Sequence, residues 1–165
     1  MLGYTHILTA STIATLPLLN NDFEYVAIYS MVYIGILIGS ILPDIDEPHS
    51  LIGKRVKFLS YPIKIIFGHR TITHNVFASI LTSILGVLLN IDIIVGIGIG
   101  MFIHILSDSI TVNGIKGALF PLTSNSYKFV LLPYSLRFKV GGSIELVLSM
   151  VLGLYNIYFF VVIFN

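Results

Sequence analysis

The chain has 165 residues, of which 56% are hydrophobic and only 10% are charged, and its formal net charge is +1. An ordinary soluble domain carries about 25% charged residues, so nine basic and eight acidic side chains are too few to cover the surface of a soluble fold. The composition therefore excludes a soluble globular enzyme and a disordered tail, the absence of cysteine excludes a disulfide-rich secreted module and thiolate metal sites, and the near-neutral charge does not indicate nucleic-acid binding.

The mean hydropathy of +0.96 is typical of an integral membrane protein, and five apolar stretches divide the chain. A bilayer core about 30 Å thick is crossed by roughly 17–25 apolar residues in a helix. The stretches that reach or approach this length are residues 3–19, 26–42, 72–89, 91–107 and 144–164. We therefore predict an all-α integral membrane bundle of about five transmembrane helices, formed as a single domain by residues 1–165.

The stretches differ in length and in what flanks them. The first has no basic region before it and no small-residue cleavage site, so we do not expect a cleavable signal peptide. The third and fourth are short and are separated by a tight turn at Asn90, Ile91 and Asp92. We expect these two helices to cross only part of the bilayer or to lean on their neighbours.

The charged residues between the stretches are segregated by sign. The loop at residues 20–25 holds Asp22 and Glu24, the turn after the third stretch holds Asp92, and both lack basic residues. The basic residues all lie in the loops at residues 43–73 and 108–143, and they are Lys54, Arg55, Lys57, Lys64, Arg70, Lys116, Lys128, Arg137 and Lys139. Because cytoplasmic loops carry an excess of lysine and arginine, we expect both loops and the N-terminus in the cytoplasm and the C-terminus outside the inner membrane.

Each basic loop also contains an apolar stretch that is interrupted by proline, at residues 58–67 and 129–136. Both stretches are too short to cross a bilayer. We expect them to be interfacial or re-entrant segments at the level of the lipid headgroups.

This topology brings the metal-ligating residue types to one side of the membrane. His6 lies in the first turns of the first helix, the acids follow the second helix, and the remaining side chains flank the cytoplasmic ends of the third and fourth helices. The converging residues are His6, Asp44, Asp46, His69, His74, His104 and Asp108. Ionisable groups at membrane depth cost several kcal/mol unless they are paired or bound, so we predict a shared site.

Local spacing supports a metal as the ligand of that site. His104 and Asp108 are four residues apart, so their side chains share one face of a helix. Asp44 and Asp46 lie between two prolines, which end the second helix and stiffen the turn. Imidazole nitrogen and carboxylate oxygen are good ligands for zinc, manganese or iron.

Each feature also has a simpler interpretation. His104 and Asp108 can form a plain hydrogen-bonded pair, Asp44 and Asp46 can cap a solvated loop, and His6 can be a buried histidine bonded to a carbonyl. His49, in the loop after the second helix, is expected to be exposed to solvent and to take no part. The run from Gly96 to Gly100 resembles a phosphate-binding loop, but its position within a span indicates close helix packing instead.

These residues resemble the motifs of the YdjM-like family of membrane-bound metal-dependent hydrolases, some of which are described as LexA-binding. The matching motifs are Thr5-His6, Leu42-Pro43-Asp44-Ile45-Asp46 with Pro48 and Ser50, His69-Arg70-x-x-Thr73-His74, His104-x-x-x-Asp108-x-x-Thr111-x-x-Gly114 and Phe120-Pro121. Thr71 and Asn75 stand where we expect glycine and serine. The family is itself distantly similar to zinc-dependent phospholipase C and its related single-strand nucleases, which implies phosphoester hydrolysis.

The residues and the resemblance together lead to one hypothesis and one alternative. The hypothesis is a metal-dependent phosphoesterase that acts on a membrane lipid or a lipid-linked phosphate. Its metal ligands would be His6, Asp44, His74, His104 and Asp108, with Asp46 and His69 orienting ligands or moving protons. Arg70, together with Arg55 and Lys116, would hold the phosphate oxygens. The alternative is a non-catalytic membrane protein that binds metal or docks a cytosolic partner; a transporter would place its ionisable residues nearer mid-bilayer.

Overall fold

The computed structural model describes residues 1–20, 24–67, 72–124 and 126–164 of the chain. The chain is mostly helical, as predicted, with one small addition: a two-stranded antiparallel sheet that pairs Ile115 with Phe129 and Lys116 with Lys128. The elements in order are α1 (Gly3–Thr15), η1 (Leu16–Asn20), α2 (Glu24–Gly39), η2 (Leu42–Asp46), α3 (Lys57–Phe67), η3 (Ile72–His74), α4 (Val76–Leu89), α5 (Asp92–Ser109), β1 (Ile115–Lys116), β2 (Lys128–Phe129), η4 (Tyr134–Leu136) and α6 (Ser143–Phe164).

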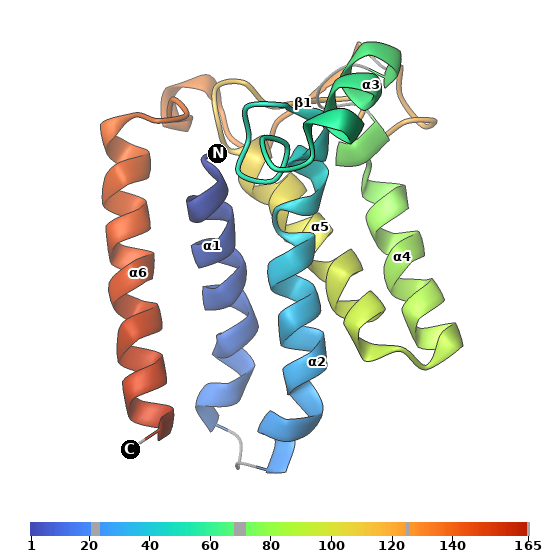
Figure 1. Cartoon of the computed structure of the whole chain (residues 1–165). Helices are drawn as coiled ribbons and strands as arrows, with labels where there is room; N and C mark the ends of the chain where they lie inside the picture. The colour runs from blue at the N-terminus through green and yellow to red at the C-terminus, as the bar shows by residue number, and fades with distance from the viewer. Residues whose placement is uncertain (21–23, 68–71, 125, 165) are drawn as a thin grey trace.

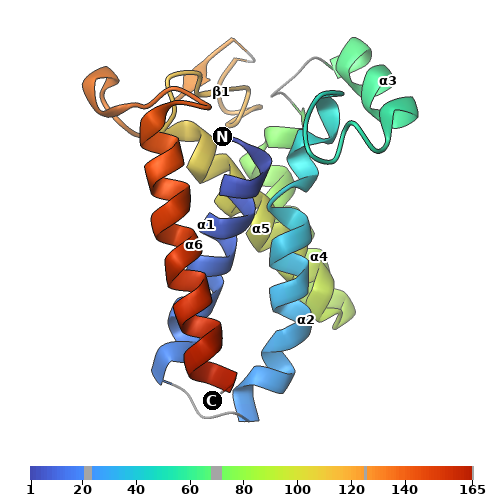
Figure 2. The same ribbon diagram turned by 60° about the vertical axis from the view of Figure 1, so that its left-hand side comes forward.

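The long helices alternate in direction along the bundle (Figure 1). The connections between α2 and α4 and between α5 and α6 both lie at the end where the N-terminus is found, together with α3 and β1, and the C-terminus lies at the opposite end. The same division is seen after rotation (Figure 2). We call the end that carries these two connections the loop end. The two long loops were predicted to lie on the same side of the membrane, and they lie at the same end of the fold.

Three segments among the described residues are long and apolar enough to cross a membrane, namely Tyr29–Asp46, Asp92–Ser109 and Ser143–Val162. The other two expected spans are shorter. With 13 residues, α1 rises only about 20 Å, but η1 continues it; α4 has 14 residues and rises about 21 Å. The turn between α4 and α5 stops short of the far ends of α1, α2 and α6 in both views (Figures 1 and 2).

Local sequence explains the reduced length of α4. Asn75 caps its first turn, because the Asn75 side chain accepts a hydrogen bond from the Ala78 amide at 3.1 Å. The helix ends at Asn90, whose φ of 55° lies in the left-handed region that asparagine tolerates. The turn predicted at residues 90–92 is thereby confirmed, whereas residues 72–74 form η3 instead of extending the helix.

Small residues let the helices approach closely in the bundle. Ala10 and Ala14 of α1 pack with Ile36 of α2 and Ile103 of α5 in a buried apolar cluster. The predicted packing role of the glycine run is confirmed: a Cβ on Gly96 would overlap the backbone of α2, and one on Gly98 would overlap α4. The close contact fixes the ends of α2 and α5 relative to each other.

The long helix α6 is tied to α1 by a polar contact inside the bundle. The Asn156 amide nitrogen donates to Thr12 Oγ1 at 2.9 Å, and its oxygen accepts from Ser11. Ser11 also bonds the Tyr33 hydroxyl of α2 at 2.7 Å. Polar side chains of this kind hold helices together in a bilayer, where apolar packing alone gives little preference for protein over lipid.

At the loop end, a second apolar cluster joins Ile105 of α5 to Ile115 and Ala118, and it supports the segment that follows α5. The apolar stretch at residues 58–67 falls in α3, where Phe58 and Ile65 are each 80% exposed. The stretch at residues 129–136 contains the end of β2 and η4 and is not a continuous helix.

Candidate metal centre

Five of the predicted metal ligands lie together at the loop end of the bundle. His6 comes from α1, Asp44 from η2, His74 from η3, and His104 and Asp108 from the last turns of α5. All five residues are buried, and Asp44 is the most exposed of them at 8%. Segments far apart in the chain therefore deliver three imidazoles and two carboxylates to one enclosed region.

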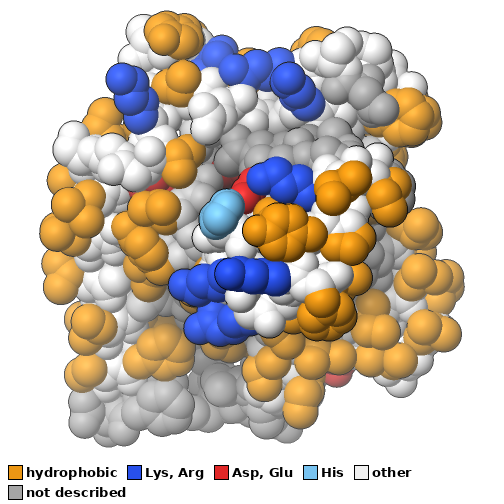
Figure 3. Space-filling model, turned by 45° about the horizontal axis from the view of Figure 1, so that its top comes forward, with side chains coloured by type: hydrophobic (Ala, Val, Ile, Leu, Met, Phe, Trp, Pro, Cys, Tyr) orange, Lys and Arg blue, Asp and Glu red, His pale blue; other side chains and the backbone are white. Residues whose placement is uncertain are grey.

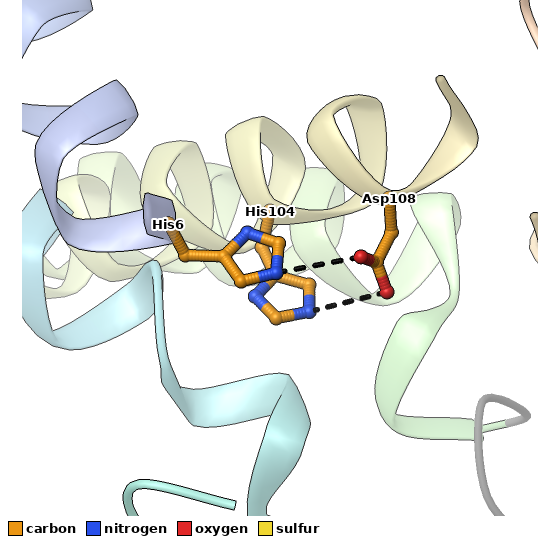
Figure 4. A group of neighbouring side chains, drawn as sticks. All are labelled: His6, His104 and Asp108. Carbon is orange, nitrogen blue, oxygen red and sulfur yellow. Dashed lines mark ion pairs between the residues drawn. The ribbon is translucent and has the colours of Figure 1, made fainter. Parts of the chain in front are cut away.

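These side chains form two groups that share His104. In the first, the rings of His6 and His104 are stacked with their centroids 3.7 Å apart, and both rings direct a nitrogen toward Asp108 (Figure 4). His6 Nε2 lies 3.4 Å from Asp108 Oδ1, and His104 Nε2 lies 4.0 Å from Asp108 Oδ2. The predicted spacing of four residues thus places His104 and Asp108 on one face of α5.

In the second group, Asp44 faces both His74 and His104. Asp44 Oδ1 lies 3.8 Å from Nε2 of each histidine, and the two Nε2 atoms are 3.2 Å apart. The ligand atoms within each group all lie within 4.8 Å of one another. Either group can therefore hold a metal ion.

Hydrogen bonds behind the rings fix which nitrogen faces the centre. Nδ1 of His104 lies 2.6 Å from the carbonyl oxygen of Ser40. A carbonyl only accepts, so Nδ1 carries the proton and Nε2 of the neutral ring presents its lone pair. This arrangement is the usual support of a metal-bound histidine.

Asp46 and Thr73 act on His74 in the same way. The Thr73 hydroxyl donates to Asp46 Oδ2, so it accepts from Nδ1 of His74, which is 3.0 Å away. Asp46 Oδ2 is itself 3.5 Å from that nitrogen and is fully buried. His74 therefore also turns Nε2 toward the centre.

The donor set fits a cation better than it fits an empty hydrogen-bond network. Two Nε2 lone pairs point toward each other across 3.2 Å, an unfavourable arrangement unless a positive charge lies beside them. Both ring nitrogens of His6 are buried; among the described residues Nδ1 lacks a hydrogen-bond partner, and Nε2 faces the Asp108 carboxylate at 3.4 Å. The Met1 nitrogen contacts Oδ1 of Asp108. Nitrogen and carboxylate donors of this kind suit zinc, manganese or iron.

The remaining predicted site residues divide into two sets. His69 and Arg70 lie outside the described residues, as does Asp22 of the acidic loop. Asp46 contacts His74 through Nδ1, the ring nitrogen that faces away from the other proposed ligands. His49 is exposed, as expected.

Several contacts at the centre had no direct signal in the sequence. Ser40 acts through its backbone carbonyl, so its side-chain type gives no indication of the role. Glu145 of α6 is buried and accepts from the Leu2 amide at 2.6 Å and the Gly141 amide at 2.7 Å, which anchors the start of the chain beside Asp108. Thr73 was part of the recognised motif, but its contact with Asp46 depends on the fold.

Basic side chains gather on the surface of the loop end, the end at which the metal centre lies. Figure 3 looks onto this end and shows lysine and arginine side chains grouped near acidic and histidine side chains. Among the residues that the structure describes, the exposed basic ones are Lys54, Arg55, Lys57, Lys116, Lys128 and Lys139. Both predicted basic loops therefore lie on the same end of the bundle as the metal centre.

The chain matches the family described as YdjM inner membrane protein over residues 1–164. It is 35% identical to the uncharacterised protein YvsG of Bacillus subtilis, across 100% of this chain and 98% of that protein. It is 33% identical to the inner membrane protein YdjM of Escherichia coli and to that of Shigella flexneri, across 74% of this chain and 63% of each relative. No solved structure matches the chain significantly, so the more distant similarity to phospholipase C stays a prediction.

Proposed function

Since the chain belongs to the YdjM inner membrane protein family, we propose that its buried histidines and aspartates form the centre of a membrane-bound, metal-dependent hydrolase. The proposed substrate is a phosphoester in a lipid or lipid-linked phosphate at the cytoplasmic leaflet. The proposed metal ligands are His6, Asp44, His74, His104 and Asp108.

One observation carries the metal proposal. Nε2 of His74 and Nε2 of His104 face each other and Asp44 Oδ1, and both rings are held from behind through Nδ1. A neutral pair in this arrangement has no proton to share between the two lone pairs. A divalent cation satisfies all three donors at once.

The chemistry of such a centre divides between the ion and the chain. A bound divalent cation supplies an acidic water near neutral pH and polarises a phosphate oxygen. The Ser40 carbonyl holds His104 in the required tautomer, and the Thr73 hydroxyl, which donates to Asp46, does the same for His74. We propose that Arg70 holds phosphate oxygens and that His69 orients a ligand or moves a proton.

The position of the centre supports a lipid substrate. Its ligands come from the start of α1, from η2 and η3 and from the last turns of α5, at the loop end of an apolar bundle. This is the level of lipid headgroups when the helices cross the bilayer. Exposed lysine and arginine side chains there attract anionic headgroups.

The test is metal content followed by activity in single variants. We expect the purified protein to contain stoichiometric transition metal, and His104→Ala and Asp108→Ala to lose most of that metal together with phosphoesterase activity. Asp92→Asn is the matched control, because Asp92 is an exposed acid at the other end of α5. Elemental analysis and turnover of phospholipid and phosphomonoester substrates are the measurements.

Full metal retention in both alanine variants would remove these residues as ligands. Stoichiometric metal without turnover of any phosphoester would favour the alternative, a non-catalytic metal-binding membrane protein. Absence of metal would favour a docking protein. After a chelator has removed the metal, the protein should regain activity when zinc, manganese or iron is added. The ion that restores the activity identifies the metal.

A further inference from the structure

Helix α3 exposes an apolar face at the loop end. The spacing i, i+3, i+4 and i+7 places four side chains on this face, and they are Phe58, Tyr61, Pro62 and Ile65. Phe58 and Ile65 are each 80% exposed, and Tyr61 is 47% exposed. An exposed apolar face of this kind marks a contact surface, because apolar side chains gained from one helix side are costly to leave in water.

The opposite side of α3 is held by the rest of the protein. Ser60 is fully buried, and Lys64 Nζ lies 2.7 Å from Glu47 Oε2, which ties the helix to the residue that follows η2. The turn before α3 is also held, because the Ser50 hydroxyl donates to the Asp44 carbonyl at 2.7 Å. The fold therefore fixes the direction in which the apolar face points.

The segment that carries this face is strongly basic. Residues 54–67 contain four basic side chains and no acidic one. Three of the four are exposed and come just before the apolar face, namely Lys54, Arg55 and Lys57. Figure 3 shows lysine and arginine side chains beside hydrophobic ones at this end of the molecule. An apolar helix face next to clustered positive charge is the chemistry that recognises an anionic lipid surface.

The length and charge of α3 favour the membrane surface over a re-entrant path, the two positions that the sequence leaves open for residues 58–67. With 11 residues, α3 rises only about 17 Å, too little to cross a bilayer. A re-entrant path would also carry Lys57 and Lys64 into the hydrocarbon, where a charge is costly. Because three described segments of the bundle can cross the membrane, its surface is always beside α3, which no diffusing partner is.

We propose that α3 binds the surface of the membrane leaflet at the loop end, with its apolar face at the acyl-chain boundary and its three exposed basic residues on anionic headgroups. This contact goes beyond the proposed function, because it needs neither a metal nor a substrate. It also holds η2 at a fixed depth, since Glu47 follows η2 directly and pairs with Lys64 of α3.

The test uses tryptophan as a probe, because the chain contains none. Phe58→Trp places a single tryptophan on the apolar face. Ser126→Trp places it on an exposed turn of the loop end, and Leu154→Trp places it on an exposed position of α6 within a candidate span. Each full-length variant is reconstituted in vesicles of phosphatidylcholine with and without phosphatidylglycerol. Lipids brominated on their acyl chains quench a tryptophan in the bilayer, and acrylamide quenches one in water.

In vesicles that contain phosphatidylglycerol, we expect brominated lipid to quench Phe58→Trp at least about threefold more strongly than Ser126→Trp. Leu154→Trp sets the response of a residue inside the bilayer. Acrylamide should quench Ser126→Trp and leave Phe58→Trp largely protected. Since Phe58 is 80% exposed, tryptophan at this position does not disturb the core, and the comparison does not depend on a change in folding.

The triple substitution Lys54→Gln, Arg55→Gln and Lys57→Gln, made in the Phe58→Trp protein, tests the basic residues. We expect it to lower quenching by brominated lipid to the level seen without phosphatidylglycerol. Equal quenching with and without the triple substitution would overturn the anionic headgroups as the partner. Acrylamide quenching of Phe58→Trp equal to that of Ser126→Trp would overturn the membrane contact. Protection from both quenchers would also overturn it, because a second copy or another protein would then cover the face.

Discussion

The orientation of His74 depends on a hydroxyl group that is not a metal ligand. Thr73 donates to Asp46 and accepts from Nδ1 of His74, so one hydroxyl links the buried carboxylate to the ring. Removing this hydroxyl leaves Asp46 beside His74 but takes away the group that keeps the proton on Nδ1 and turns Nε2 toward the metal centre. Groups that orient a ligand typically contribute 10–100-fold to metal affinity.

Thr73→Val tests this contribution, because valine keeps the shape of threonine and lacks the hydroxyl. We expect the zinc affinity of Thr73→Val to fall by about 10- to 100-fold while the protein stays folded. Competition with a chromophoric chelator measures the affinity. The control is Thr82→Val, since the Thr82 hydroxyl donates to the Ala78 carbonyl within its own helix. Equal losses in both variants would contradict the role of Thr73.

The sequence predicted which residues could bind a metal, but it did not predict which groups would hold those residues in place. His104 and Asp108 share a helix face because of their spacing, and any helix would bring them together. The support of His104 by Ser40 was not predictable, because it uses a backbone carbonyl that every residue possesses. His49 was expected to be exposed, and it is, whereas a pocket that it borders depends on where Asp44 and Gly3 lie in space.

At the scale of the elements, α5 carries the centre because its glycines let two neighbours approach it. Gly96 and Gly100 lie against α2, and Gly98 lies against α4, so successive small residues serve opposite sides of one helix. The contact with α2 determines where Ser40 and Asp44 lie relative to His104, since both follow α2 directly. Close packing in the middle of the bundle therefore sets the geometry at its end.

Gly96→Ala should disturb both stability and metal binding. A Cβ at this position would overlap the carbonyl oxygen of Val32, and overpacking of this kind costs about 1–3 kcal/mol. We expect a lower melting temperature in detergent and a weaker zinc affinity, because α2 must move away from α5. Thermal unfolding and chelator competition are the measurements.

Gly153→Ala provides the comparison within the same protein. Gly153 lies in α6, and a Cβ there has nothing within 4 Å among the described residues. Alanine is the better helix former by roughly 0.5–1 kcal/mol, so this variant should be as stable as the parent or slightly more stable. If Gly96→Ala melted at the same temperature as Gly153→Ala, the close packing of α2 and α5 would not determine stability.

At the scale of the whole molecule, the order and direction of the helices followed from the sequence, but their depth did not. Apolar stretches and the segregation of basic residues predicted that the two long loops share one end, and Figure 1 agrees. The limits of α4 depend on Asn75 and Asn90, whose capping contacts shorten the helix that hydropathy alone extends to residue 72. Composition reports how apolar a segment is, whereas caps decide how much of it is helical.

Because α4 is short, α4 and α5 either cross the whole bilayer or turn back inside it, and site-directed labelling distinguishes the two. A charged Asp92 at mid-bilayer would cost roughly 2.5–3.5 kcal/mol, so we expect the turn between α4 and α5 to reach water on the side opposite the loop end. The chain contains no cysteine, so single substitutions give an unambiguous signal. Ile91→Cys reports on this turn and Ser126→Cys on the loop end, and both positions are exposed.

With a membrane-impermeant maleimide, Ser126→Cys should react only in inside-out vesicles and Ile91→Cys only in spheroplasts, because the basic loops favour the cytoplasm. The unsubstituted chain is the blank. The reverse pattern would invert the orientation and place the metal centre outside the cytoplasm. If Ile91→Cys reacted from neither side while Ser126→Cys reacted normally, α4 and α5 would form a re-entrant hairpin, and the protein would cross the membrane three times with both termini still on opposite sides.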